Sequence, residues 1–166
     1  MARMFRENAR LPAEGWSDWV RAIVPVENKH NEHSYEDRSD GQTGVMCTNI
    51  REALTDEMSE CGIYEWQARR PGGRNVVYVG STCREAPGSL RDRILEYCTN
   101  GSHKSGIINK ALQRLYELWV RVKTSGGSSD HSREVAKNME DELLQSYDYA
   151  WNFEKNGKSK IRQILK

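Results

Sequence analysis

Hydrophobic and polar residues alternate in three short stretches of the chain, and this alternation is typical of β-strands. Residues 62–67 and 75–80 are rich in aromatic and β-branched side chains and flank the turn sequence RRPGGR, so they predict a hairpin. Residues 116–123 alternate apolar with charged side chains, which predicts a third strand with one solvated side.

The alternation also predicts which side chains of the hairpin lie together, because successive residues of a strand point to opposite faces. Val76, Tyr78 and Gly80 are expected on one face, and the two valines between them on the other. Tyr64 joins Tyr78 on its face if the two strands pair in a suitable register.

Apolar residues spaced three and four apart predict three helices after the hairpin. The first runs from Ser89, an expected N-cap, to Cys98; the second spans about residues 105–115, and the third about residues 131–147 after the link SGGSSD, which ends in an N-cap. These elements predict a small α/β domain of the α+β type, with a three-stranded antiparallel sheet flanked by helices.

Two of the helical stripes contain a charged residue where the spacing predicts an apolar one. Arg93 lies in the stripe of the first helix and Glu140 in the stripe of the third. A buried charge is costly unless it is paired. The two residues are therefore explained either by a structural Arg–Glu pair between the helices or by a functional site, where such local conflicts are expected.

Composition narrows the class of protein. The chain of 166 residues is 37% hydrophobic and 30% charged, which suits one polar globular domain with an extension, and it has no apolar run long enough for a membrane span or a signal peptide. The cysteines Cys47, Cys61, Cys83 and Cys98 lack CxxC spacing and the density of a disulfide framework, so reduced thiols in an intracellular protein are expected. A short amphipathic element over residues 16–24 is expected to pack onto the domain.

The net charge of +1 conceals an uneven distribution. Residues 1–60 contain 7 Lys/Arg against 12 Asp/Glu, a net charge of −5. Residues 61–123 contain 11 against 5, a net charge of +6, and residues 124–166 are balanced at 7 against 7. The basic middle third favours an anionic partner such as nucleic acid, and plain solvation of a surface is the alternative.

The hairpin motifs GIY (62–64) and YVG (78–80) resemble the GIY-YIG nuclease domain, with Val at the middle of the second motif. Further elements of that family follow in order: Arg93 with Tyr97 four residues later, Glu140 in the pattern Glu-x-x-Leu-Leu, and Asn152 about a dozen residues beyond. The resemblance covers residues 61 to about 153. It implies a metal-dependent DNA endonuclease with a GIY-YIG-like fold.

The resemblance also implies the site. Its catalytic residues would be Tyr64, Tyr78, Arg93, Tyr97, Glu140 and Asn152. One carboxylate, Glu140, suits a hard cation such as Mg²⁺ or Mn²⁺, and the planar Arg93 suits phosphate oxygens. For Tyr64 to take a proton from the attacking water, its pKa would have to fall below the ordinary value of about 10. DNA contacts are expected from Arg69, Arg70, Arg74, Arg84, His103 and Lys104.

The segments VVYVGSTCR, NGSHK, ELWVRVK and YDYAWN resemble the plant Effector of Transcription proteins, nuclear regulators built around a GIY-YIG domain. This resemblance implies nuclear localisation and a role in transcription. The expected organisation is an acidic N-terminal extension (1–60), the nuclease domain (61–153) and a basic C-terminal helix (154–166).

Three functions stay open: an endonuclease that nicks DNA, a regulatory DNA-binding domain with weak or no catalysis, and a protein–protein adaptor. The oligomeric state, monomer or dimer on DNA, is also open.

Overall fold

The fold is seen in a computed structural model, which describes residues 4–5, 15–25, 53, 60–84, 89–98, 103–127 and 129–152. The basic helix predicted over 154–166 and most of the predicted N-terminal extension lie outside the described residues. Among the described helices, none combines the length and the apolar composition that a membrane span requires.

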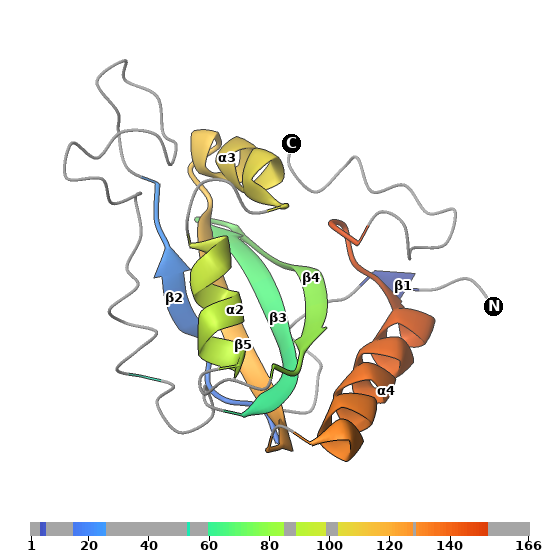
Figure 1. Cartoon of the computed structure of the whole chain (residues 1–166). Helices are drawn as coiled ribbons and strands as arrows, with labels where there is room; N and C mark the ends of the chain where they lie inside the picture. Colours follow the sequence, from blue (N-terminus) through green and yellow to red (C-terminus); the bar gives the residue numbers. More distant parts are fainter. Residues whose placement is uncertain are drawn as a thin grey trace.

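Four antiparallel strands form the central sheet in the order β2-β5-β3-β4 (Figure 1). They are β2 (Val20–Ile23), β3 (Cys61–Arg70), β4 (Gly73–Thr82) and β5 (Glu117–Gly126). The α+β class and the three predicted strands are confirmed, but the predicted number of strands was wrong by one. The amphipathic element expected near residues 16–24 supplies β2, whose four residues are too few to show a clear alternation.

Residues from the predicted N-terminal extension form strands with later parts of the chain. β2 pairs with β5, where Val20 lies opposite Val120. In a separate two-stranded sheet, β1 (Met4–Phe5) pairs in parallel with β6 (Tyr147–Asp148).

The β3–β4 hairpin closes through the two-residue turn Pro71-Gly72. Proline favours the first position of a type II turn, and the second position requires a positive φ, which Gly72 supplies at 83°. The turn sets the pairing as far as Gln67 with Val76, and a bulge beyond that pair places Tyr64 directly opposite Gly80.

A β-bulge in β4 changes which side chains of the hairpin share a face. The register shifts after the Trp66–Tyr78 pair, so that Val77 is the extra residue. Tyr78 lies on the same face as Tyr64, as predicted, and Val77 packs in their core cluster. Val76 packs in the cluster on the opposite face, so the prediction that it shares a face with Tyr78 was wrong.

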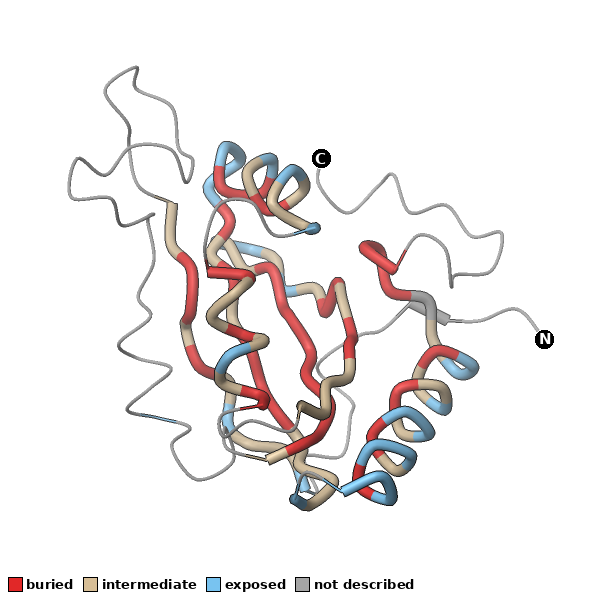
Figure 2. The backbone as a smooth tube through the Cα atoms, in the orientation of Figure 1, coloured by how far each residue is buried: buried red, intermediate tan, exposed pale blue. Residues whose placement is uncertain are grey.

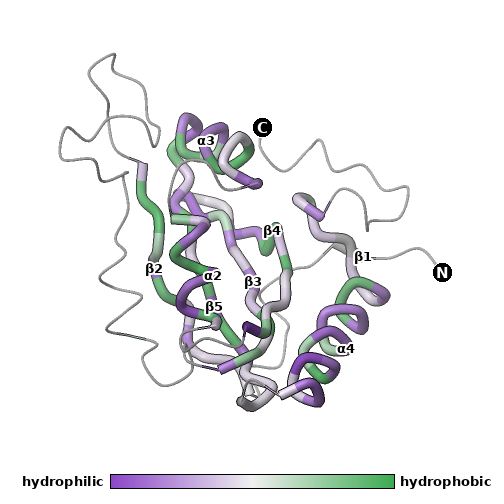
Figure 3. The backbone as a smooth tube through the Cα atoms, in the orientation of Figure 1, coloured by the Kyte–Doolittle hydropathy of each residue, from purple (hydrophilic) through white to green (hydrophobic). Residues whose placement is uncertain are grey.

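Helices cover both faces of the sheet (Figures 1 and 2). α2 (Ser89–Tyr97) and α3 (Ser105–Gln113) pack in the larger core cluster. α4 (Asp130–Ser146) packs on the opposite face, where its Leu144 joins Val79 of β4. Most of α4 is hydrophilic in Figure 3, as expected of a helix that buries only one stripe.

Serines lie at the N-termini of α4 and α2, and their hydroxyls accept hydrogen bonds from different parts of the chain. Ser129 caps α4, because its hydroxyl accepts the Ser132 N–H at 3.1 Å. The N-cap was predicted at the last residue of the link and lies one residue earlier, with Asp130 in the first turn of the helix. Ser89 was predicted to cap α2, but its hydroxyl accepts the backbone N–H of Arg84 at 2.9 Å. Ser89 therefore ties α2 to the segment that follows β4.

Strand β5 is buried on both faces at Arg121, so the predicted solvated side was wrong at this position. Arg121 is 3% exposed and donates two hydrogen bonds, at 2.9 and 2.7 Å, to one carboxylate oxygen of Glu65. The Tyr149 hydroxyl donates to the other oxygen at 2.6 Å, and the rings of Trp16 and Trp19 lie 4.3 and 4.8 Å from the guanidinium. A charged residue in a strand indicates a solvent-exposed face only when the fold offers that residue no such partners.

Candidate active site

Three tyrosines from three elements form a hydrogen-bonded cluster on the α2 side of the sheet, called the tyrosine cluster below. Tyr64 lies on β3, Tyr78 on β4 and Tyr97 on α2. The hydroxyl oxygens of Tyr64 and Tyr97 are 2.8 Å apart, and the Tyr97 hydroxyl donates to that of Tyr78 at 3.4 Å. Three residues that the sequence singled out therefore meet at one point.

Gly80 makes room for the tyrosine cluster. A Cβ atom at this position would lie 2.4 Å from the hydroxyl oxygen of Tyr64 and 2.6 Å from its ring carbon Cζ, which is closer than real Cβ atoms approach. The ring of Tyr64 thus occupies the space that a side chain at Gly80 would need. The glycine that ends the YVG motif has a packing role.

Arg93 extends from α2 to the tyrosine cluster. Its Nε donates to the Tyr64 hydroxyl at 3.3 Å, and its guanidinium lies 5.1 Å from the centre of the Tyr97 ring. Its Nη1 donates to Glu96 of the same helix at 2.7 Å. The alternative explanation of Arg93, a structural pair with Glu140 between the helices, was wrong because Glu96 is the carboxylate that Arg93 binds.

Glu96 is a site residue that the sequence reasoning missed. Its second oxygen binds Arg84 at 2.6 Å, so one carboxylate bridges two arginines. Partial burial alone would raise the pKa of the Glu96 carboxyl, but the hydrogen bonds from Arg93 and Arg84 hold that pKa below its ordinary value. The available signal was the spacing of three residues between Arg93 and Glu96, which brings side chains together on a helix.

Burial keeps the hydroxyls of Tyr64 and Tyr97 protonated at neutral pH. Burial raises the pKa of Tyr64 above its ordinary value, and the neighbouring Tyr78 hydroxyl raises it further. Burial, followed by the Tyr64 and Tyr78 hydroxyls, raises the pKa of Tyr97 in the same direction. Tyr64 could act as a base near neutral pH only if its pKa were lowered. Its pKa is raised instead, so Tyr64 is unsuited to that role.

Glu140 approaches the sheet from the face opposite the tyrosine cluster. Its side chain is buried, and one carboxylate oxygen accepts the hydroxyl of Ser81, with Lys137 Nζ 3.9 Å from the same oxygen. Ser81 directly follows Gly80 in β4. Because successive side chains of a strand point to opposite faces, the carboxylate and the tyrosine cluster flank the same point of the edge strand from its two sides.

The donor set fits a divalent cation that is held mainly by water and substrate. Among the described residues, no group of three or more His, Cys, Asp or Glu side chains could hold a metal ion. Mg²⁺ commonly binds one or two carboxylates, keeps several waters and takes the remaining ligands from substrate phosphates. A single buried carboxylate at Glu140 is compatible with that mode of binding.

Asn152 holds the edge strand. Its Oδ1 accepts the Val79 N–H at 3.0 Å, and its Nδ2 donates to the Val79 carbonyl at 2.9 Å. The Trp151 N–H donates to the Val77 carbonyl at 2.7 Å. The segment after α4 thus satisfies backbone groups along the open edge of β4, and Asn152 fixes the residue between Tyr78 and Gly80.

The predicted DNA-binding arginines at the hairpin tip differ in their surroundings. The Arg69 guanidinium lies 3.9 Å from the centre of the Trp119 ring, and that of Arg70 lies 4.4 Å from the centre of the Tyr116 ring. Arg74 is exposed. Of the three, Arg74 is the arginine whose side chain is best placed to meet a DNA backbone.

The turn before α3 brings two predicted DNA-binding residues to the tyrosine cluster. Lys104 Nζ donates to the Trp151 carbonyl at 2.6 Å and lies 5.0 Å from the centre of the Tyr78 ring. The His103 ring lies 5.5 Å from that of Tyr97 and 6.4 Å from that of Tyr78. Both residues thus adjoin the predicted catalytic residues.

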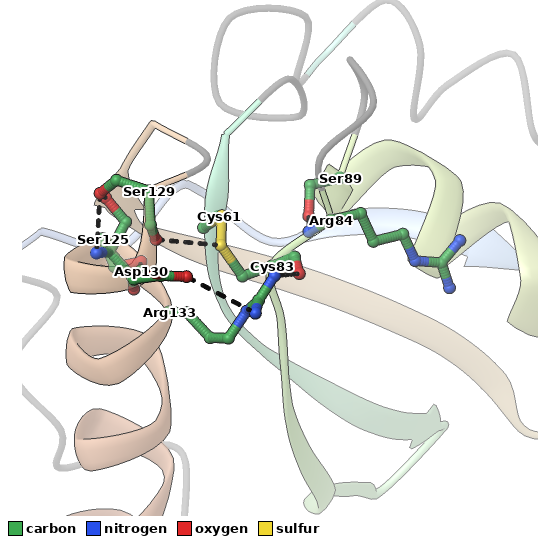
Figure 4. The surroundings of a disulfide bond; sticks show 9 residues. Cys61, Cys83, Arg84, Ser89, Ser125, Ser129, Asp130 and Arg133 are labelled. Atoms are coloured by element: carbon green, nitrogen blue, oxygen red, sulfur yellow. Dashed lines mark hydrogen bonds and ion pairs between the residues drawn. A yellow bond between two sulfur atoms is a disulfide. The ribbon is translucent and has the colours of Figure 1, made fainter.

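A disulfide joins Cys61 at the start of β3 to Cys83, just after β4 (Figure 4). The prediction of reduced thiols was wrong for this pair, because the hairpin register brings the two residues opposite each other. The backbone carbonyl of Cys83 also accepts a hydrogen bond from Arg133 of α4 at 3.5 Å. Cys98 is free and buried, and Cys47 lies outside the described residues.

The groups of the candidate site indicate the kind of substrate that the protein binds. Phenols and an arginine face one side of an edge strand, and a buried carboxylate lies on the other side, a set of groups that suits an anionic substrate with phosphate oxygens. The family model for GIY-YIG domain-containing proteins matches residues 17–165, and the chain belongs to this family. Membership indicates a nuclease, a hydrolase whose substrate is DNA. Among curated proteins and solved structures, none is similar enough to match the chain.

Proposed function

We propose that this protein is a metal-dependent DNA endonuclease that hydrolyses one phosphodiester bond per encounter and so nicks a single strand. The observation that carries the proposal is the contact of Arg93 with the Tyr64 hydroxyl, at the point of β4 that Glu140 reaches from the other face. A fixed cation and a buried carboxylate within one short region are the groups that phosphodiester hydrolysis requires.

Arg93 would stabilise the negative charge that develops on the phosphate during hydrolysis. Its guanidinium is already oriented by Tyr64 and by the face of the Tyr97 ring, so little freedom is lost when phosphate binds. The hydroxyls of the tyrosine cluster would donate hydrogen bonds to phosphate oxygens or to the attacking water.

Glu140 would hold the divalent cation together with waters and a phosphate oxygen of the substrate. When bound, the ion neutralises charge on the phosphate and assists the leaving 3′ oxygen. Asn152 keeps β4 in place between the two halves of the site through its paired bonds to Val79. A single site cuts one strand at a time, so cutting both strands would require a dimer or a second encounter.

We also propose that the nuclease acts in the plant nucleus as a regulator of transcription, on the basis of the four sequence segments that resemble Effector of Transcription proteins. Nuclear proteins are kept reduced. The disulfide between Cys61 and Cys83 is the observation that argues against this compartment.

A second function is a DNA-binding domain with weak or no catalysis. The bridging of Arg93 and Arg84 by Glu96 favours it, because a carboxylate already sits where phosphate oxygens would bind the two guanidinium groups. In an active enzyme the substrate must displace Glu96 or approach Arg93 from another side. DNA binding that does not depend on Glu140 or on metal would support this function.

Nicking of supercoiled plasmid with Mg²⁺ or Mn²⁺ tests the proposal. We expect Arg93→Ala and Glu140→Gln to lose about 100- to 1,000-fold in rate, and EDTA to abolish nicking. Glu142→Gln is the matched control, since Glu142 is exposed on the same helix. Circular dichroism confirms that the variants are folded. Nicking that survives EDTA and Glu140→Gln would refute the proposal.

A further inference from the structure

The site needs a group that removes a proton from the attacking water, and the two buried phenols of the tyrosine cluster do not supply it. Tyr64 and Tyr97 are each 1% exposed, and their hydroxyls are engaged with each other at 2.8 Å. Their buried phenols are protonated at neutral pH, as shown above. Tyr64 and Tyr97 are therefore unsuited to accept the proton, and the groups that adjoin them are the candidates.

His103 is in contact with the cluster and is open to solvent. Its ring packs edge-on against Tyr97 and Tyr78, at 5.5 and 6.4 Å between ring centres, while the residue as a whole is exposed. The turn that carries it is fixed by Lys104, whose side chain donates to the Trp151 carbonyl at 2.6 Å. An imidazole in this place can touch a water beside the phenols and can release a proton to bulk solvent.

The charges around His103 favour its neutral form. Arg93 faces it from α2 and Lys104 adjoins it in the turn, while Glu96 of α2 is the opposing acidic group. Partial burial and then these two cations lower the pKa of the imidazole below its ordinary value of 6.5. A neutral imidazole has a free ring nitrogen that accepts a proton at pH 7.

We propose that the His103 imidazole is a catalytic residue that accepts the proton of the attacking water during phosphodiester hydrolysis. The water oxygen bonds to phosphorus as the bond from phosphorus to the 3′ oxygen breaks. The proton of the water passes to His103, and the leaving oxygen takes a proton from solvent. The imidazolium then returns its proton to bulk water, which restores the neutral ring. This inference rests on the proposed nuclease activity.

The competing role for His103 is that of a cation that binds DNA phosphate. The two roles predict opposite dependences of function on pH. A cation would bind DNA best at low pH, where the imidazole is charged, whereas a base works best above the pKa, where it is neutral. Loss of a base lowers kcat with little effect on DNA affinity, and loss of a binding cation does the reverse.

The test is plasmid nicking from about pH 5 to pH 8, with DNA affinity measured separately for each variant. We expect the native rate to rise up to about tenfold per pH unit and then level off. His103→Gln should lose about 100- to 10,000-fold of the plateau rate and the pH dependence, with unchanged DNA affinity. His103→Ala should regain activity with added imidazole. His131→Gln, which alters an exposed histidine of α4, should behave as the native protein.

The outcomes separate the two proposals. If the native protein nicks DNA and His103→Gln keeps both its rate and its pH dependence, the role of His103 is refuted and the nuclease stands. If the native protein does not nick, the nuclease fails and the inference falls with it. A metal-free NMR titration is independent of activity: the pKa of the His103 imidazole should lie below its ordinary value of 6.5, and Arg93→Ala should raise it. A His103 that is still cationic at pH 7 would overturn the inference.

Discussion

Replacing Gly80 by alanine tests whether this glycine shapes the active site. The added Cβ would lie 2.4 Å from the Tyr64 hydroxyl oxygen, and an ordinary contact begins at 3.4 Å, so the Tyr64 side chain must move by about 1 Å. Tyr64 is buried and cannot swing into solvent. A displacement of this size also lengthens its hydrogen bonds to Tyr97 and Arg93, which are 2.8 and 3.3 Å long.

We expect Gly80→Ala to destabilise the protein by about 1–3 kcal/mol, the usual cost of overpacking a core. The loss of backbone freedom in the unfolded chain offsets up to about 1 kcal/mol of that cost. The nicking rate should fall roughly 100-fold, because a shift of about 1 Å in a catalytic group can reduce the rate by that factor. Both effects arise from the same displacement of Tyr64.

Denaturant unfolding measures the stability of Gly80→Ala, and plasmid nicking measures its activity. Gly73→Ala is the matched control on the same strand, since nothing lies within 4 Å of a Cβ at Gly73 and its φ is not positive. This control should be neutral or stabilised by up to about 1 kcal/mol. Adding Tyr64→Phe to Gly80→Ala removes the nearest atom, so the double variant should be more stable than the sum of the single variants predicts.

The reasoning is refuted if Gly80→Ala is as stable as Gly73→Ala and nicks DNA at the native rate. Additive free energies in the double variant would also contradict it, because they would show that Tyr64 does not feel the new methyl group.

Three further predictions concern the stability of the fold. Glu65→Ala should cost about 3–5 kcal/mol of unfolding free energy, since it leaves the buried Arg121 charge without its partner, and a native midpoint in denaturant would contradict this. Reduction of the Cys61–Cys83 disulfide, which closes a loop of 22 residues, should cost about 2–4 kcal/mol, and the double serine variant should not respond to dithiothreitol. Because burial raises the pKa of Tyr64, the folded state retains a proton that the unfolded state loses. Stability should therefore be constant below pH about 10 and fall above it, as denaturant midpoints against pH would show.

The sequence alone predicted three strands of the central sheet and its three helices, and it singled out most residues of the candidate site. The alternation of residues 62–67 and 75–80 predicted the hairpin, because strand period and turn chemistry are local properties of the chain. The charged residues Arg93 and Glu140 stood out for the same local reason, since each interrupts an apolar stripe. The family match is consistent with these local signals.

Other features were decided by contacts between distant parts of the chain. The fourth strand, β2, exists because β5 offers it an edge, and its four residues carry no clear pattern of their own. The turn sets the register of the hairpin only as far as Gln67 and Val76. The bulge at Val77 then shifts the register by one residue and brings Cys61 opposite Cys83, and no pattern in the sequence predicted that bulge. The burial of Arg121 depends on Glu65, which is far away in the sequence.

The chemistry of the site was likewise decided by the tertiary structure. The sequence supplied Tyr64 as a candidate base, but the direction of its pKa shift depends on how deeply the ring is buried and on which phenols surround it. His103 lies on a turn with no distinguishing pattern, and only packing brings its ring against Tyr97. Residue identity sets which groups can react, whereas burial and neighbouring charge set their protonation states, and these come from the fold.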